Sequence, residues 1–209
     1  MEISYVEEIK RKLIHLSSLW MVAVTLLLAQ KQWIVCLIFA ALLLLTLVLE
    51  HDYANGGKYL GRLYGKLFKK MLRNEVKPGQ WIVSGGAPVL AAGLMMNVLF
   101  APVIAASGLA VMLTGDAFAA LIGRKFGKHK AVNGKSYEGF AAFVIAGTIA
   151  VSVVFALSGL SGRCYIWGAV AVVAAAVVEL FQKQLKLDDN FTIPLTAGIV
   201  LFFGFRFWM

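Results

Sequence analysis

Apolar runs longer than 17 residues recur along this chain and limit its fold more than any other feature of the sequence. A helix of about 20 apolar residues is long enough to cross the hydrocarbon core of a bilayer. Hydrophobic residues make up 60% of the 209 positions, a larger share than a soluble domain of this size can bury. Segments of about ten residues with alternating polarity, the pattern of a membrane barrel, do not occur. The sequence therefore predicts an all-α, polytopic integral membrane bundle.

We expect about seven transmembrane helices, near residues 13–29, 33–49, 80–98, 100–122, 140–157, 165–181 and 191–207. The segment after the second of these is too polar to span a membrane. In residues 55–74, apolar side chains recur at helical spacing while Lys and Arg fall mostly on the opposite side. This pattern predicts one amphipathic helix lying in the membrane interface. The two cysteines, Cys36 and Cys164, provide no disulfide framework.

The distribution of positive charge predicts how these helices are oriented. With a cytoplasmic N-terminus, 17 of the 20 Lys and Arg residues lie in cytoplasmic segments, in agreement with the positive-inside rule. The acidic residues and histidines then fall on the inner side or in the inner half of a helix, so the active face is expected to be cytoplasmic. Nucleic acid is a poor explanation for the net charge of +9, because the basic residues lie at loop ends without a soluble nucleic-acid-binding module.

A carboxylate interrupts one of the apolar runs. Asp116 lies eight residues before Arg124, which places it about 12 Å deeper in a continuous helix. An ionised side chain near the middle of a membrane helix costs about 2.5–3.5 kcal/mol on insertion scales, so it needs a partner. We expect Gly115 to interrupt the helix here and to give water access to the carboxylate. Two explanations remain open: a Mg²⁺ ligand, or a structural carboxylate paired with a buried cation on another helix.

Glycines and cations follow Asp116 at high density. Gly123, Gly127 and Gly134 alternate with basic and hydroxyl side chains, namely Arg124, Lys125, Lys128, His129, Lys130, Lys135 and Ser136. Such glycines let backbone N–H groups approach phosphate oxygens, while Lys and Arg neutralise the charge. The pattern is not a Walker A loop, because His129 stands where that motif needs a glycine. Residues 115–139 are therefore a candidate nucleotide-binding loop, although a basic loop end can also act as a membrane anchor alone.

Two glutamates near helix ends have simple structural explanations beside a functional one. Glu138 begins the helix after the loop, where a carboxylate favours the N-terminal dipole. Glu179 lies one turn before Lys183, and an i,i+4 ion pair would account for it.

The acidic group near the C-terminus is harder to explain by helix capping alone. Asp188, Asp189 and Asn190 stand at a predicted helix start, where capping explains at least one of them. Capping does not explain why three carboxylates, those of Glu179, Asp188 and Asp189, return to the face that carries Asp116. They are therefore candidate metal ligands.

Charged residues also mark the first helix. Glu8, Arg11, Lys12 and His15 share one side of it. Arg11 and Lys12 have the positions of membrane anchors, whereas His15 lies one turn further into the membrane. Arg11, Lys12 and His15 are further candidates for the site.

The central block reads Asp-x-x-Ala-x-x-x-Gly-Arg-x-x-Gly-Lys-His-Lys over residues 116–130, followed by Gly-Lys-Ser-x-Glu-Gly over 134–139. Together with Arg11-Lys12-Leu-Ile-His15 and Asp188-Asp189-Asn190-x-x-Ile193-Pro194, it resembles the polyprenol, dolichol, phytol and diacylglycerol kinases that use CTP. The resemblance implies a compact helical domain, here residues 1–209, that transfers the γ-phosphate of CTP to the hydroxyl of a membrane lipid alcohol with Mg²⁺.

The resemblance also implies roles for the candidate residues. The catalytic candidates are Asp116, Lys135 and Glu138. The nucleotide-binding candidates are Arg124, Lys128, His129, Lys130, Gly134, Lys135 and Ser136. The metal candidates are Asp116, Glu179, Asp188 and Asp189, with Arg11, Lys12, His15 and Asn190 as further site residues. Asp116 would either hold Mg²⁺ or accept the proton of the hydroxyl, and the lipid alcohol itself stays open.

Phosphatidate cytidylyltransferases are similar through the same central block and are the alternative. They typically continue with a Ser-Pro-Lys-Lys-Thr-type segment and carry Lys-Asp and Asp-Arg signatures near the C-terminus. Here Asn133-Gly134-Lys135-Ser136 lacks the proline, and Asp188-Asp189-Asn190 stands near the end, so the kinase branch is favoured. A transporter or scaffold is less favoured, because the acids gather on one face and no symmetrical pair of broken helices is visible.

Overall fold

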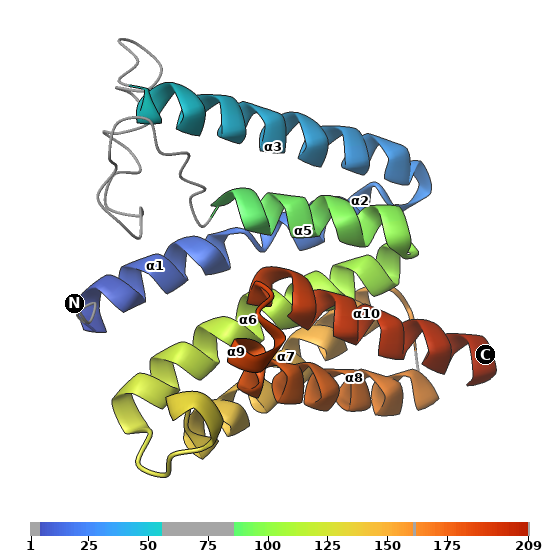
Figure 1. Ribbon diagram of the computed structural model, residues 1–209. Coiled ribbons are helices and arrows are strands. Elements are labelled where there is room, and N and C mark those ends of the chain that lie inside the picture. Colours follow the sequence, from blue (N-terminus) through green and yellow to red (C-terminus); the bar gives the residue numbers. More distant parts are fainter. Residues whose placement is uncertain (1–4, 56–85, 161, 209) are drawn as a thin grey trace.

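The computed structural model describes residues 5–55, 86–160 and 162–208. These residues form a bundle of helices with no β-strand among them (Figure 1). In chain order the helices are α1 (Tyr5–Ser17), α2 (Trp20–Leu27), α3 (Gln32–Ala54), α5 (Gly86–Leu99), α6 (Pro102–Phe126), α7 (Tyr137–Leu157), α8 (Arg163–Leu180), α9 (Gln182–Leu185) and α10 (Asp189–Trp208). Single 3₁₀ turns at Ala29–Lys31 and Val132–Gly134 join some of them. The all-α prediction is confirmed, while the predicted interfacial helix lies, apart from Asn55, outside the described residues.

The central helix of the bundle is α6, which packs against α1, α2, α5, α7, α8 and α10 (Figure 1). Pro102 begins it, at a position where the fixed φ of proline suits the first helical turn. Small side chains then allow neighbouring backbones to come close. A Cβ atom at Gly108 would lie 2.8 Å from the carbonyl oxygen of Pro194 in α10. Helix α6 therefore carries Asp116 through the interior of the bundle.

Five of the described helical segments are long and apolar enough to cross a membrane, namely Ala29–Ala54, Pro102–Phe126, Tyr137–Leu157, Arg163–Leu180 and Asp189–Phe207. They coincide with five of the seven predicted spans. Large apolar side chains are exposed on their outer surfaces, including Leu44, Ile149, Ile166 and Phe203, as contact with lipid requires. Helix α5 is shorter, and the beginning of its predicted span, 80–85, lies outside the described residues.

The first predicted span, 13–29, is not one helix. The chain tightens at Ser18 and Leu19, whose N–H groups donate to carbonyls three residues earlier, and α2 starts at Trp20. The Oγ atom of Ser17 also donates to the carbonyl oxygen of Ile14, at 2.6 Å. Side-chain hydrogen bonds of this kind compete with regular helix formation. As a result, α1 ends beside α6, and the chain continues as a separate helix.

The predicted helix break at Gly115 was wrong, because α6 runs without interruption from Pro102 to Phe126. Gly115 instead provides space for a neighbouring helix. A Cβ atom there would lie 2.7–2.9 Å from three ring atoms of Phe143 in α7. Access to Asp116 therefore depends on a cavity between helices and not on an irregular backbone.

Candidate active site

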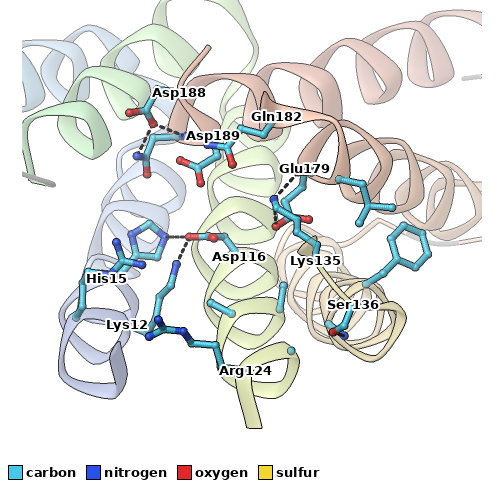
Figure 2. A pocket seen from close by; sticks show the side chains of 18 of the residues that line it. Lys12, His15, Asp116, Arg124, Lys135, Ser136, Glu179, Gln182, Asp188 and Asp189 are labelled. Carbon is cyan, nitrogen blue, oxygen red and sulfur yellow. Dashed lines mark hydrogen bonds and ion pairs between the residues drawn. The ribbon is translucent and has the colours of Figure 1, made fainter. Parts of the chain in front are cut away.

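A cavity of about 1050 Å³ opens where one end of α6 meets α1, α5, α7 and the segment from α8 to α10. Figure 2 shows the side chains that surround it. Most of the predicted site residues line this cavity: Arg11, Lys12, His15, Asp116, Arg124, Lys130, Gly134, Lys135, Ser136, Glu179, Asp188, Asp189 and Asn190. Residues from four separated parts of the sequence are thus brought together in one place.

Asp116 forms an ion pair with the first helix. The Nζ atom of Lys12 lies 2.6 Å from Oδ2 of Asp116, and Nε2 of His15 lies 3.5 Å from the same oxygen (Figure 2). Both side chains of the Lys12–Asp116 pair are largely buried, at 7% and 13% exposure. The structural explanation, a carboxylate paired with a cation on another helix, is therefore confirmed. Asp116 also lines the cavity, so the pairing is compatible with a chemical role.

Glu8 connects two arginines beside this pair. Its Oε1 accepts a hydrogen bond from Nη2 of Arg11 at 2.6 Å, and its Oε2 accepts one from Nη1 of Arg124 at 3.3 Å. Glu8 is buried, with 3% of its surface exposed. The carboxylate thus fixes the Arg124 guanidinium, a predicted nucleotide-binding group, at the edge of the cavity. Arg11 therefore does more than anchor the helix to the membrane surface.

A second ion pair crosses the cavity between the loop and α8. Lys135 donates to both a carboxylate oxygen and the carbonyl oxygen of Glu179 (Figure 2). The expected pair between Glu179 and Lys183 does not form, because α8 ends at Leu180 and the two residues are not on one continuous helix. Lys183 donates instead to the carbonyl oxygen of Asn133, at 3.2 Å. Glu179 is buried, and Lys135 is the cation that neutralises it.

The predicted nucleotide-binding loop, 115–139, is only partly a loop, because its residues up to Phe126 belong to α6 and α7 begins at Tyr137. Two of its glycines, Gly123 in α6 and Gly127 after it, serve helix packing more than a phosphate cradle. Ser136 is the N-cap of α7, and its buried Oγ accepts a hydrogen bond from the N–H of Gly139 at 3.1 Å. A Cβ atom on Gly127 would lie 2.6 Å from that Oγ, and one on Gly123 would lie 3.2 Å from it. Gly123 and Gly127 therefore make room for the cap between α6 and α7. Gly134 differs, because nothing lies within 4 Å of its Cβ position and its φ is +79°.

Three predicted site residues do not line the cavity: Lys128, His129 and Glu138. Glu138 accepts hydrogen bonds from His129, through the backbone N–H at 3.2 Å and through Nδ1 at 2.7 Å. The His129 side chain is 80% exposed. This carboxylate therefore holds the outer side of the loop, next to the start of α7.

The acidic turn before α10 combines capping with a place in the cavity. Asp188 Oδ1 accepts hydrogen bonds from the backbone N–H and from Nδ2 of Asn190, at 2.9 and 2.7 Å. Its predicted capping role is confirmed. Asp189 is the first residue of α10, and Figure 2 shows its carboxylate pointing toward the space beside Asp116. The predicted return of these carboxylates to the face of Asp116 is confirmed.

The donor atoms in the cavity are of the type that Mg²⁺ prefers. The carboxylate residues Asp116, Glu179, Asp188 and Asp189 line the same space. Among the described residues, no three His, Cys, Asp or Glu side chains are close enough to form a metal site by themselves. Mg²⁺ in nucleotide sites is held by one or two carboxylates together with phosphate oxygens and water. The residues therefore fit an ion that arrives with a polyphosphate, and not a metal held by the protein alone.

Several residues of the site could not be identified from the sequence. Glu8 is separated from Arg124 by 116 positions, and Gln182 and Ser18 are single polar residues that line the cavity. No motif distinguished them. The only available signal was the position of Glu8 on the same helical side as Arg11 and Lys12.

Comparison with known proteins adds an independent observation. The chain is 28% identical over 192 residues to an uncharacterised protein of Rickettsia prowazekii, covering 90% of each chain. It is 26% identical over 197 residues to an uncharacterised protein of Methanocaldococcus jannaschii, covering 93% of this chain and 92% of the other. It is 36% identical over 129 residues to the phytol kinase of Synechocystis, covering 57% of this chain and 54% of that kinase. The chain thus matches about half the length of the phytol kinase. No protein-family model and no solved structure match it.

Proposed function

We propose that this chain is a lipid-alcohol kinase that transfers the γ-phosphate of CTP to the hydroxyl of a membrane isoprenoid alcohol of the phytol or polyprenol type. The similarity to a phytol kinase supports a kinase that acts on a lipid alcohol. In this proposal residues 1–209 form one catalytic domain. Diacylglycerol is a second acceptor class to be tested.

One observation carries the proposal. A single cavity, at one end of a bundle with an apolar outer surface, is lined both by a group of cations and by four carboxylate residues, Asp116, Glu179, Asp188 and Asp189. Cations neutralise a triphosphate, and carboxylates bind a divalent ion or accept a proton. The apolar surroundings suit a substrate whose hydroxyl is attached to a hydrocarbon chain.

The residues that line the cavity divide into two roles. Arg124, Lys130 and Lys135 would contact the triphosphate, with Gly134 and Ser136 next to it. Lys128 and His129 lie outside the cavity, and we assign them no contact with the nucleotide. One or two of the carboxylates of Asp116, Glu179 and Asp189 would hold Mg²⁺ together with phosphate oxygens, and the ion would neutralise charge on the phosphates and orient them.

The proposed reaction is a phosphoryl transfer that uses these residues. The hydroxyl oxygen of the lipid attacks the γ-phosphorus and forms a new O–P bond, while the bond to the bridging oxygen breaks and CDP leaves. A carboxylate of the cavity, Asp116 or Asp189, accepts the hydroxyl proton. Catalysis of this kind depends mostly on positioning and on neutralising charge.

The orientation in the membrane is part of the proposal. CTP is a cytoplasmic metabolite, and most Lys and Arg residues lie at one end of the predicted spans. We place the cavity and the N-terminus on the cytoplasmic side. Labelling of single cysteines introduced at Lys128 and at Gly159, with a membrane-impermeant reagent, tests this orientation, because only the first should be protected in intact cells.

A transfer assay tests the reaction. Purified protein in detergent is given Mg²⁺, CTP labelled on the γ-phosphate, and phytol, a polyprenol or diacylglycerol in separate reactions. We expect label on an extracted lipid, release of CDP, and loss of both in EDTA or in Asp116→Asn. Excess unlabelled ATP should not compete if CTP is the donor. Release of pyrophosphate with phosphatidic acid, and no labelled alcohol, would instead indicate a cytidylyltransferase and contradict the proposal.

A further inference from the structure

The tip of the loop between α6 and α7 has an unusual backbone. Asn133 has φ +62° and Gly134 has φ +79°, so two successive residues are left-handed. A non-glycine residue adopts this conformation at some energetic cost, although Asn tolerates it better than most. The conformation turns the chain so that Lys135 follows directly into the cavity. Some contact must therefore keep the tip in this shape.

Asn133 is fastened to the junction of α8 and α9 through its side chain and backbone. Its Nδ2 donates to Oε1 of Gln184 at 2.6 Å and to the carbonyl oxygen of Leu180 at 2.8 Å. Nε2 of Gln184 donates back to Oδ1 of Asn133 at 3.1 Å. Lys183 adds a bond to the Asn133 carbonyl oxygen. The two amides therefore form a reciprocal pair.

The groups of α8 and α9 that bind Asn133 are the carbonyl of Leu180 and the side-chain amide of Gln184. Leu180 is the last residue of α8, and its carbonyl has no acceptor role left inside that helix, so a side-chain donor satisfies it. Gln184 lies on α9, a helix of four residues that follows directly after α8. The short α9 thus has a clear structural consequence, because it presents one amide to Asn133.

The loop has a second attachment to α8, the ion pair of Lys135 with Glu179. That attachment cannot persist unchanged if Lys135 binds phosphate, because its ammonium group must then turn toward the nucleotide. The amide pair of Asn133 and Gln184 is uncharged and does not include the side chain of Lys135. It can therefore keep the loop in place while Lys135 changes partner.

We propose that Gln184 is a positioning residue, which holds Asn133 in its left-handed conformation and thereby keeps Lys135 directed at the phosphates of the bound nucleotide. The expected effect on the KM for CTP rests on the function proposed above. The expected effect on the order of the loop does not depend on that function.

The kinetic test compares Gln184→Ala with Leu185→Ala, a control on the same short helix whose side chain is exposed. We expect Gln184→Ala to raise the KM for CTP about 3- to 10-fold, the effect of losing one or two hydrogen bonds, with little change in kcat. Gln184→Glu keeps an acceptor for Nδ2 of Asn133 but loses the donor to Oδ1 of Asn133, so its KM should lie between those of the wild type and Gln184→Ala. Asn133→Gly keeps the positive φ without the amide and should resemble Gln184→Ala. The double variant should be no worse than Asn133→Gly, because both substitutions remove the same contact.

Hydrogen exchange provides the readout that needs no turnover. Backbone N–H groups of Ala131, Lys135 and Tyr137 donate within the loop. Gln184→Ala should exchange faster in a peptide that covers 129–140, whereas Leu185→Ala should match the wild type. Equal exchange and equal KM in Gln184→Ala and Leu185→Ala would overturn the proposal. If the wild-type protein phosphorylates no lipid alcohol, the proposed function fails, and the exchange measurement still decides whether Gln184 holds the loop.

Discussion

The Nζ atom of Lys12 lies 2.6 Å from Oδ2 of Asp116, although 104 residues separate the two in the chain. This contact joins α1 to the central helix α6 inside the cavity. Each charge is buried enough that it depends on the other for compensation. Removing one partner of a buried ion pair costs about 3–5 kcal/mol, whereas replacing both with neutral groups costs much less. Single and double substitutions of this pair can therefore separate its effect on stability from its effect on activity.

We predict that Lys12→Met lowers the thermal stability of the protein in detergent, because Asp116 then remains as an uncompensated carboxylate. Adding Asp116→Asn to Lys12→Met should recover most of that stability but no kinase activity. Thermal unfolding and the CTP transfer assay, run on the same preparations, check both parts. Lys31→Met, an exposed lysine outside the site, serves as the control. A double variant less stable than either single variant would show that the two charges do not compensate one another.

The helices could largely be predicted from the sequence, because burial in lipid requires long apolar segments and a helix satisfies its own backbone. The runs that became α3, α6, α7, α8 and α10 are of this kind. The break at Ser18 and Leu19 could not be predicted in the same way. It arises from short-range hydrogen bonds and from the docking of α1 on α6, which apolar periodicity does not encode.

The site was predictable as a set of residues but not as a set of contacts. The acids and cations were identified because charge is rare in apolar surroundings. Their partners were not, since Lys12–Asp116 and Lys135–Glu179 join distant parts of the chain. Gly123 and Gly127 illustrate a different difficulty. Their spacing suggests phosphate binding, but the same absence of a side chain also suits the packing of α6 against the Ser136 cap.

Glu8 provides a second prediction. Glu8→Gln removes the negative charge that holds both Arg11 and Arg124. Charge-assisted hydrogen bonds contribute about 1.5–3 kcal/mol, so we expect the KM for CTP to rise by about 10-fold or more as Arg124 loses its fixed position. Glu7→Gln makes the same change of charge on the exposed side of α1 and should have a smaller effect. Equal KM values for the two variants would rule out this role of Glu8.

Ser136 allows a third prediction, because loss of its capping role would lower stability, whereas loss of its predicted nucleotide contact would raise the KM for CTP. Ser136→Ala removes the hydrogen bond that caps α7, and loss of an N-cap costs about 1 kcal/mol. We expect a measurable drop in thermal stability with a KM for CTP within about twofold of wild type, since a neutral hydrogen bond to a phosphate adds little beside the nearby lysines. Thermal unfolding and initial-rate kinetics separate the two effects. A large rise in KM without loss of stability would instead assign Ser136 mainly to the nucleotide.

Glu138 provides the sharpest contrast between motif and geometry. It lies within the block that resembles the CTP-dependent kinases, yet its carboxylate accepts hydrogen bonds from His129 on the outer side of the loop and does not line the cavity. We therefore predict that Glu138→Gln changes kcat by no more than about 5-fold, the range of an exposed ion pair, whereas Asp116→Asn abolishes turnover. Single-turnover assays with CTP on both variants, each confirmed as folded by thermal unfolding, make the comparison. Complete loss of turnover in folded Glu138→Gln would mean that the loop rotates when the nucleotide binds, because only such a movement brings this carboxylate to the phosphates.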